Sequence, residues 1–385
     1  MKDSKIGHDE AGTFWHIHFY MFQLADDVFM MRSNEQLWWD VVSGALQTAK
    51  KIKDALNLGR PVVLYSNHDI PWRDTLINGI CDFLSSAGYN CADRILPPES
   101  TPESLIQDQN AKDRYRPQNH GKNLQGFLRE YNQLKERLYW IQRPKNTKVW
   151  LDFLRNWKPG SPDDGLFIVE TEYTQAMPKL KSTIETVDYS RIVDSYDIAI
   201  FSGIIFSEIA EEEGRPITVD GKRYAATLAA ELCSGNAQIA ADFTARYNLQ
   251  TDPIETLYLV CDFDIGSAEG LKRKLWTAQT RTLFPILEIK RVELIEKYRA
   301  KLEAALEQYR QKGKPIQQRD PNDTRLKIEV EDVDMLELNT IAKMGYAAGI
   351  PEYENIDTLA ECRNLLSHLN TINPQDVAFL LSMGN

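Results

Sequence analysis

Two short apolar runs constrain the fold of this chain more than any other feature. Residues 62–65 read VVLY and residues 165–171 read GLFIVET, and neither run alternates apolar with polar residues. Such strands are apolar on both faces, which is typical of a parallel sheet covered by helices. The stretch 75–89, TLINGICDFLSSAGY, has its apolar residues at helical spacing. The sequence therefore predicts an α/β fold, in which ligands bind beyond the carboxyl ends of the strands.

Further elements extend this α/β region. Apolar runs predict strands at 90–96, 196–203 and 255–263, the last two reading YDIAIFSG and ETLYLVCDF. Helical spacing predicts one amphipathic helix over 124–141. Two more helices, 223–235 and 236–247, are expected on either side of Gly235, because glycine commonly ends a helix.

The pattern changes at about residue 267, after which the chain reads as an all-α helical bundle. Helices are expected at 267–283, from Pro285 to about 306, and at 335–348, 356–370 and 374–383. Asn373 is expected to cap the last of these, with Pro374 in its first turn. With 385 residues, the chain is long enough for two or three domains. We expect an aromatic-rich element over 1–60, an α/β module with a helical lid over 61–266, and the helical domain over 267–385.

Charge is unevenly distributed along the chain. The net charge of −11 argues against a protein that binds nucleic acid over its whole surface. The stretch 271–314, however, contains 12 Lys and Arg against 5 Asp and Glu. This concentration predicts contacts with RNA, or else a solvated helix face with internal pairs such as Glu293 with Lys297. The residues expected to contact RNA are Lys272, Arg273, Lys274, Arg281, Lys290 and Arg291.

The five cysteines are scattered and form no CxxC pair, which predicts reduced thiols and neither a zinc site nor a redox site. The sequence also lacks the basic-then-apolar order of a signal peptide and any run of 18 apolar residues. We therefore expect a cytoplasmic protein with no membrane partner, no bound metal and no cofactor.

The strongest chemical motif is RNLLSH, in which Arg363, Asn364 and His368 lie on the helix predicted at 356–370. Asn364 and His368 share a face at i and i+4, while Arg363 needs its long side chain to reach the same cleft. Metal-independent RNA cleavage uses an acid or base that titrates near neutrality and a cation that stabilises the phosphorane. His368 and Arg363 suit these roles, with Asn364 orienting groups by hydrogen bonding.

Residues 268–385, with this motif on the penultimate helix, resemble the HEPN family of all-α domains. The resemblance implies a metal-independent endoribonuclease acting in antiviral defence or a toxin–antitoxin system, with catalytic residues Arg363, Asn364 and His368. It also implies that the active site forms where two such domains pair, so a homodimer or larger assembly is expected. The family's acidic and basic pair on an earlier helix corresponds to Glu288 with Arg291 or to Glu293 with Lys297.

The N-terminal region resembles a P-loop NTPase of the AAA+ or STAND kind, with GLFIVETE resembling the acidic second motif and residues 228–243 resembling a helical lid. The loop after the first strand, SNHDIPWRD, departs from this family. A phosphate loop needs glycines and then Lys followed by Ser or Thr, whereas this loop has no glycine and offers Arg73 and Asp74. The resemblance therefore implies a degenerate, pseudo-ATPase module used for sensing or assembly.

Two alternatives remain open at this stage. The first is a non-catalytic adaptor or regulatory subunit that binds a protein partner or inhibitor and whose helical half only dimerises. The second is a metal-dependent hydrolase, because His68 and Asp69 follow one predicted strand while Glu170 and Glu172 end another. The carboxyl ends of parallel strands lie at one edge of a sheet, where these four side chains could hold a divalent metal.

Overall fold

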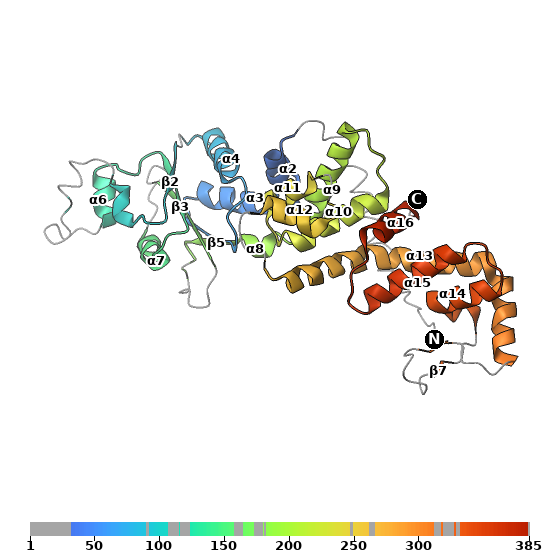
Figure 1. Cartoon of the computed structure of the whole chain (residues 1–385). Coiled ribbons are helices and arrows are strands. Elements are labelled where there is room, and N and C mark those ends of the chain that lie inside the picture. Colours follow the sequence, from blue (N-terminus) through green and yellow to red (C-terminus); the bar gives the residue numbers. More distant parts are fainter. Residues whose placement is uncertain are drawn as a thin grey trace, which may run out of the picture. The chain divides into compact units, whose positions relative to one another are not determined.

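The computed structural model describes residues 32–89, 92–106, 115, 124–157, 165–172, 180, 182–246, 249–261, 266–311, 317–318, 327–328 and 332–383 (Figure 1). The chain divides into two compact units, residues 1–197 and 198–385. This division does not coincide with the predicted boundaries at 60/61 and 266/267. Most of the predicted aromatic-rich element, residues 1–31, lies outside the described part of the chain.

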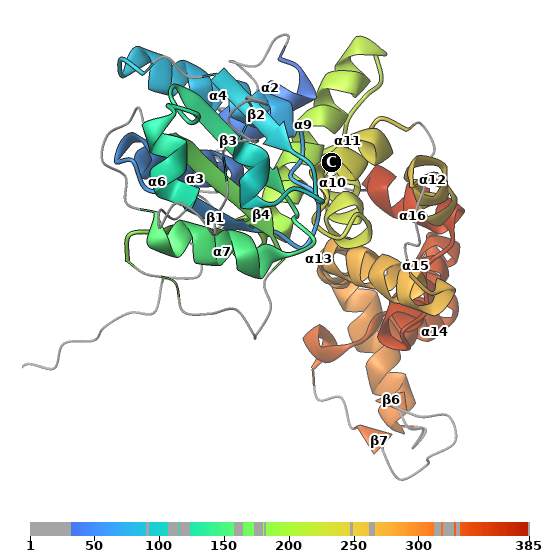
Figure 2. The ribbon, with the colours of Figure 1, turned by 90° about the vertical axis from the view of Figure 1, so that its left-hand side faces the viewer.

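The first unit is an α/β structure built on a five-stranded parallel sheet (Figure 2). Its strands lie in the order β2-β3-β4-β1-β5, so β1 lies between β4 and β5. The strands are β1 Val62–Tyr65, β2 Ala92–Leu96, β3 Arg137–Gln142, β4 Leu166–Thr171 and β5 Glu185–Asp188. The helices are α2 Asn34–Val41, α3 Ser43–Asn57, α4 Arg73–Ser86, η1 Pro102–Leu105, α6 Leu124–Glu130, α7 Thr147–Asn156 and α8 Tyr189–Ile192.

Apolar side chains on both faces of the sheet produce two buried layers. Val63 and Tyr65 of β1 belong to an aromatic-rich core with residues of α6, α7 and η1. Val62 and Leu64 alternate with them, so they point to the opposite face, where α3 packs on β1. The predicted strands at 62–65, 90–96 and 165–171 and the helix at 75–89 are thus confirmed as β1, β2, β4 and α4.

The helix predicted over 124–141 is wrong in its second half. Only α6 is helical, and residues 137–142 form β3 between β2 and β4. Asn132 and Glu136 have φ angles of 49° and 58°, in the left-handed region that a right-handed helix cannot include. The helical spacing of the apolar residues was therefore accidental, and the run RLYWIQ is a buried strand.

Two predicted strands are also wrong, because short apolar runs do not distinguish a buried strand from a buried helix. Residues 196–203 lie in the 18-residue helix α9, Ser195–Glu212. Residues 255–260 lie in α12, Pro253–Val260, whose N-cap Asp252 accepts a hydrogen bond from the Glu255 backbone N–H. The capping signal of Asp252 followed by Pro253 identifies this helix in the sequence.

The second unit is mostly helical, and within it α10 packs along α13 while α14 and α15 pack against each other and against α13. Besides most of α9, it comprises α10 Val219–Leu232, α11 Ala237–Thr244, α12, α13 Ala268–Gln311, η3 Val333–Met335, α14 Leu338–Ala347, α15 Tyr353–Ser367 and α16 Pro374–Met383. A two-stranded antiparallel pair joins β6 Gln317–Gln318 and β7 Lys327–Ile328. The helices α10 and α11, predicted as a lid on the α/β module, belong to this unit.

The predicted helices at 335–348, 356–370 and 374–383 are confirmed as α14, α15 and α16. Asn373 caps α16, since its Oδ1 accepts from the Asp376 backbone N–H at 2.9 Å. The break expected at Pro285 is wrong: α13 continues through Pro285 and departs from helical geometry at Tyr298. Leu283, Ile286 and Leu287 are buried, so packing on both sides of the proline holds the helix together.

Candidate functional site

The carboxyl edge of the sheet contains a buried ion pair between Arg73 and Glu170. Glu170 lies near the end of β4 and is 0% exposed. Arg73 is the first residue of α4, and its Nε and Nη2 lie 2.9 Å and 3.1 Å from the two Glu170 carboxylate oxygens. The Trp140 indole N–H donates to the same carboxylate at 2.9 Å. Bidentate contact and an added donor are what a fully desolvated carboxylate requires.

Arg143 joins this pair to the exposed acids of the edge. It follows β3, and its Nε lies 3.3 Å from Glu170 and 3.2 Å from Asp69. Its Nη1 lies 2.9 Å from Glu172, and its Nη2 donates to the Ser66 carbonyl at 3.1 Å. One guanidinium group therefore contacts three carboxylates: Glu170 near the end of β4, Glu172 directly after β4, and Asp69 in the segment after β1.

Strand pairing and two unusual backbone positions explain this convergence. β3, β4 and β1 are neighbours in the parallel sheet, with Glu170 paired to Gln142 on one side and Leu64 on the other. Arg143 and Trp72 have φ angles of 38° and 43°, which are uncommon for residues other than glycine. Strained backbone often gathers at functional sites. We therefore treat this edge as the candidate functional site.

The predicted metal-binding set is brought together only in part. Asp69, Glu170 and Glu172 converge, but the guanidinium of Arg143 lies among them. His68 is exposed, and its backbone carbonyl accepts from the Ser66 hydroxyl. Among the described residues, no group of three or more His, Cys, Asp or Glu side chains is placed to hold a metal ion. The acids at this edge contact arginines instead.

The three residues predicted to be catalytic lie at the end of α15 but form no common cluster. Asn364 exchanges two amide hydrogen bonds with Asn339 of α14, at 2.6 Å and 2.8 Å. Arg363 lies 3.7 Å from Glu337, and His368 is exposed at the C-cap of α15. Within the described structure, no hydrogen bond or ion pair joins the side chains of Arg363, Asn364 and His368 to one another.

Most of the predicted RNA-binding cations on α13 have partners in the protein. Arg281 pairs with Glu231, Lys290 with Glu293, and Arg291 with Glu288, while the Lys274 ammonium donates to the Ser234 hydroxyl. Arg291 also donates to the backbone carbonyls of Asp334 and Leu336. Lys272 and Arg273 are exposed and form no ion pair within the part of the chain that is described. Pairing within the protein therefore accounts for much of this charge, but the predicted pair of Glu293 with Lys297 is wrong: Glu293 pairs with Lys290, and Lys297 pairs with Glu352.

The sequence reasoning missed Arg143 as a member of the site. Its role depends on β3, whose residues the sequence analysis assigns to the helix predicted over 124–141. The signal that could have revealed it is a charged residue two positions after the apolar run LYWI. Arg143 is the first residue after β3, as Glu172 is the first residue after β4.

The described residues thus form an α/β unit with a five-stranded parallel sheet, followed along the chain by a mostly helical unit. No known family's sequence profile matches the chain. No curated protein sequence matches it either. No helix among the described residues is both long and apolar enough to cross a membrane.

One solved structure that aligns with the chain is a mutant of RuvB from Thermotoga maritima. The alignment covers 61% of this chain and 75% of that chain, with 11% sequence identity and a TM-score of 0.31.

Proposed function

We propose that this chain is a non-hydrolytic adaptor or regulatory subunit, whose α/β unit is a scaffold for assembly with a protein partner. The observation that carries the proposal is the bidentate Arg73–Glu170 pair at the carboxyl edge of the sheet. In an α/β sheet this edge is the usual place for a ligand. Here it is occupied by the protein's own ionic side chains.

Three features of the edge oppose nucleotide binding. The loop between β1 and α4 contains no glycine, so its backbone N–H groups are poorly suited to surround phosphates. The guanidinium groups of Arg73 and Arg143 already contact carboxylates. Asp69 and Glu172 are mostly exposed and would repel a triphosphate. A bound nucleotide would therefore have to break buried ion pairs that it cannot replace.

The proposal predicts that the full-length chain neither binds nor hydrolyses ATP with Mg²⁺. Calorimetric titration should show no saturable heat, and phosphate release should not exceed a protein-free control. Affinity purification of the tagged chain from its native cells should recover a stoichiometric protein partner. Saturable ATP binding accompanied by turnover would contradict the proposal.

A second candidate function is metal-independent RNA cleavage by Arg363, Asn364 and His368. A specific contact favours it: the Trp276 indole N–H of α13 donates to the Leu366 carbonyl of α15 at 2.8 Å. This bond places the end of α15 beside the turn of α13 that carries the exposed cations Lys272 and Arg273. In this second proposal one RNA strand contacts the exposed His368 together with these two cations.

If this second proposal is correct, His368→Ala lowers RNA cleavage by at least about 100-fold, because general acid or base catalysis contributes that much. Cleavage should survive EDTA, and the products should carry 2′,3′-cyclic phosphates. His68→Ala is the matched histidine control and should cleave like the wild type. Cleavage lost in EDTA and in His68→Ala, but retained in His368→Ala, would instead select the metal-dependent hydrolase.

A further inference from the structure

The turn between α15 and α16 is exposed, although buried residues lie on both sides of it. Residues 367–370, which include His368, are exposed, whereas Leu366 and Ile372 are 1% and 4% exposed. Leu369 is 70% exposed and has a φ angle of 60°, in the left-handed region that is unfavourable for a residue with a Cβ. Strained backbone of this kind persists only where surrounding contacts hold it, and it often lies at functional sites. Side chains outside the turn are therefore expected to hold it.

The first anchor of the turn is the indole of Trp276 in α13. Its N–H donates to the Leu366 carbonyl at 2.8 Å. The His368 backbone N–H donates to the Asn364 carbonyl at 3.0 Å, which continues the hydrogen-bond pattern of α15 up to the histidine. Because Leu366 lies two residues before His368, the indole fixes the end of the helix that the histidine follows.

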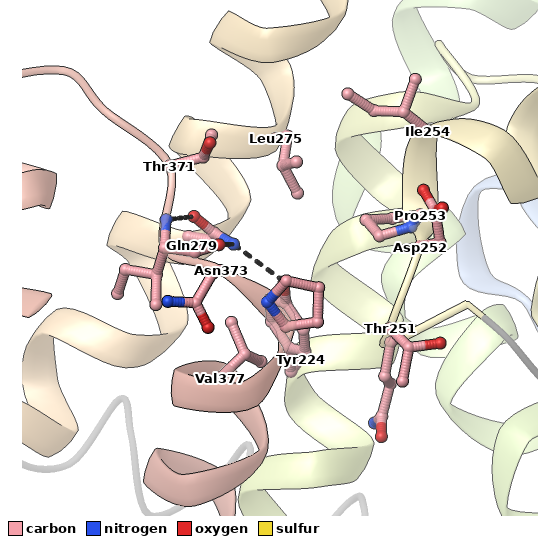
Figure 3. A pocket seen from close by; sticks show the side chains of 13 residues that line it. Tyr224, Thr251, Asp252, Pro253, Ile254, Leu275, Gln279, Thr371, Asn373 and Val377 are labelled. Carbon is pink, nitrogen blue, oxygen red and sulfur yellow. Dashed lines mark hydrogen bonds between the residues drawn. The ribbon is translucent and has the colours of Figure 1, made fainter.

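The second anchor is the side-chain amide of Gln279, three residues further along α13. This spacing places Gln279 and Trp276 on the same side of the helix. Gln279 is 2% exposed; its Oε1 accepts from the Ile372 backbone N–H at 2.7 Å, and its Nε2 donates to the Ile372 carbonyl at 3.0 Å. Figure 3 shows the Gln279 amide directed at the backbone between Thr371 and Asn373. One side chain thus holds both polar groups of a single backbone residue.

These anchors determine where His368 lies. Among the described residues no hydrogen bond holds its imidazole, so the position of the ring follows the position of the backbone. The backbone from Leu366 to Ile372 is held at its two ends by side-chain hydrogen bonds of 2.7–3.0 Å. A general acid or base has to lie within hydrogen-bond reach of the proton that it transfers, and a misplacement of about 1 Å can lower a rate about 100-fold. An unanchored turn would therefore be poorly suited to this chemistry.

We propose that Trp276 and Gln279 are positioning residues for RNA cleavage, and that they act by holding the backbone on both sides of His368. The proposal rests on the second proposed function, in which His368 is the general acid or base. Neither side chain contacts RNA in this proposal. Loss of either anchor leaves the imidazole and the exposed cations of α13 in place, so kcat falls while KM changes little.

Trp276→Phe and Gln279→Met test the proposal in the full-length chain. The substrate is a short single-stranded RNA of mixed sequence that is labelled at one end, and kcat is measured per folded molecule at a temperature where every variant is folded. Trp276→Phe removes the indole N–H and should lower kcat about 10-fold, while Gln279→Met removes both bonds to Ile372 and should lower it about 100-fold. KM should stay within about twofold of the wild type in both variants.

Hydrogen exchange provides a readout that does not depend on activity. The backbone N–H groups of residues 367–372 should exchange at least about tenfold faster in Gln279→Met than in the wild type, because the turn opens more often. Unchanged exchange in both α13 variants would overturn the proposal, since the two side chains would then not hold the turn.

Two variants in the first unit control for a general loss of stability. Trp150→Phe removes an indole N–H bond to the Ser100 carbonyl at 2.9 Å, and Gln125→Met removes an amide bond to the Phe153 carbonyl at 2.7 Å. Both should lower the unfolding midpoint without changing kcat. A loss of kcat in these controls as large as in the α13 variants would overturn the positioning role.

The cleavage function and the positioning role fail in different ways. If the wild type cleaves RNA and both α13 variants have the same kcat as the wild type, only the positioning role is overturned. If the wild type leaves the RNA intact, the cleavage function is contradicted and the positioning role with it. A raised KM with unchanged kcat would place the two side chains in RNA binding and would also overturn the proposal.

Discussion

Replacing Glu170 with alanine should lower the free energy of unfolding of the first unit by about 3–5 kcal/mol. The expectation follows from its 0% exposure and from the two guanidinium groups and one indole N–H that it accepts from. Removing one partner of a buried ion pair leaves the other charges uncompensated, which costs about this much. Urea unfolding, monitored by tryptophan fluorescence, should show the lower free energy of unfolding, since Trp140 contacts Glu170 directly.

Glu172→Ala is the matched control for this prediction. Glu172 lies two residues further along the chain and also contacts Arg143, at 2.9 Å, but its side chain is 62% exposed. Exposed ion pairs contribute about 0–1 kcal/mol, so this variant should unfold almost like the wild type. Equal destabilisation by the two substitutions would contradict the buried character of the Glu170 site.

Gly44→Ala should destabilise the first unit by about 2–3 kcal/mol, the upper part of the range for overpacking. An added Cβ would lie 2.3 Å from Asp197 Oδ2 and 2.9 Å from the Ile192 carbonyl oxygen. Neither atom moves easily: the Asp197 carboxylate accepts from the backbone N–H groups of Gly44 at 2.9 Å and Asp194 at 3.2 Å, and the carbonyl belongs to the backbone. Chemical denaturation measures the effect.

Gly79→Ala in α4 provides the comparison for this glycine. Its added Cβ would meet only Lys53 Nζ at 3.7 Å, an ordinary contact. Alanine is a better helix former than glycine by roughly 1 kcal/mol, so this substitution should leave stability unchanged or raise it. If Gly79→Ala lowered the free energy of unfolding as much as Gly44→Ala, helix propensity and local crowding could not explain the two changes in stability.

The buried strands were the part of the fold that the sequence predicts best. Turn residues such as Gly and Pro precede both runs in the sequence, and the apolar runs match the observed strands β1 and β4 closely. The strand β3 could not be recognised, because its apolar residues continue the helical spacing of α6. The helices α9 and α12 were read as strands because a short apolar run has no period of its own.

The sequence predicts where the candidate site lies, but it does not predict which side chains contact one another there. Asp69, Glu170 and Glu172 were expected at one edge because parallel strands end together. Their partner Arg143 depends on the pairing of β3 with β4 and on a left-handed backbone angle, and neither is encoded locally. Whether acids at a sheet edge face a metal, a phosphate or an arginine is decided by such tertiary contacts.

A double-mutant cycle between Arg73 and Glu170 tests the central claim most directly. The free energy of unfolding is measured for the wild type, Arg73→Met, Glu170→Gln and the double variant. We predict a coupling energy of about 2 kcal/mol or more, in the range of close and desolvated charge pairs. A coupling energy below about 0.5 kcal/mol would show that the two side chains act independently. It would contradict the claim that an Arg73–Glu170 ion pair occupies this edge of the sheet.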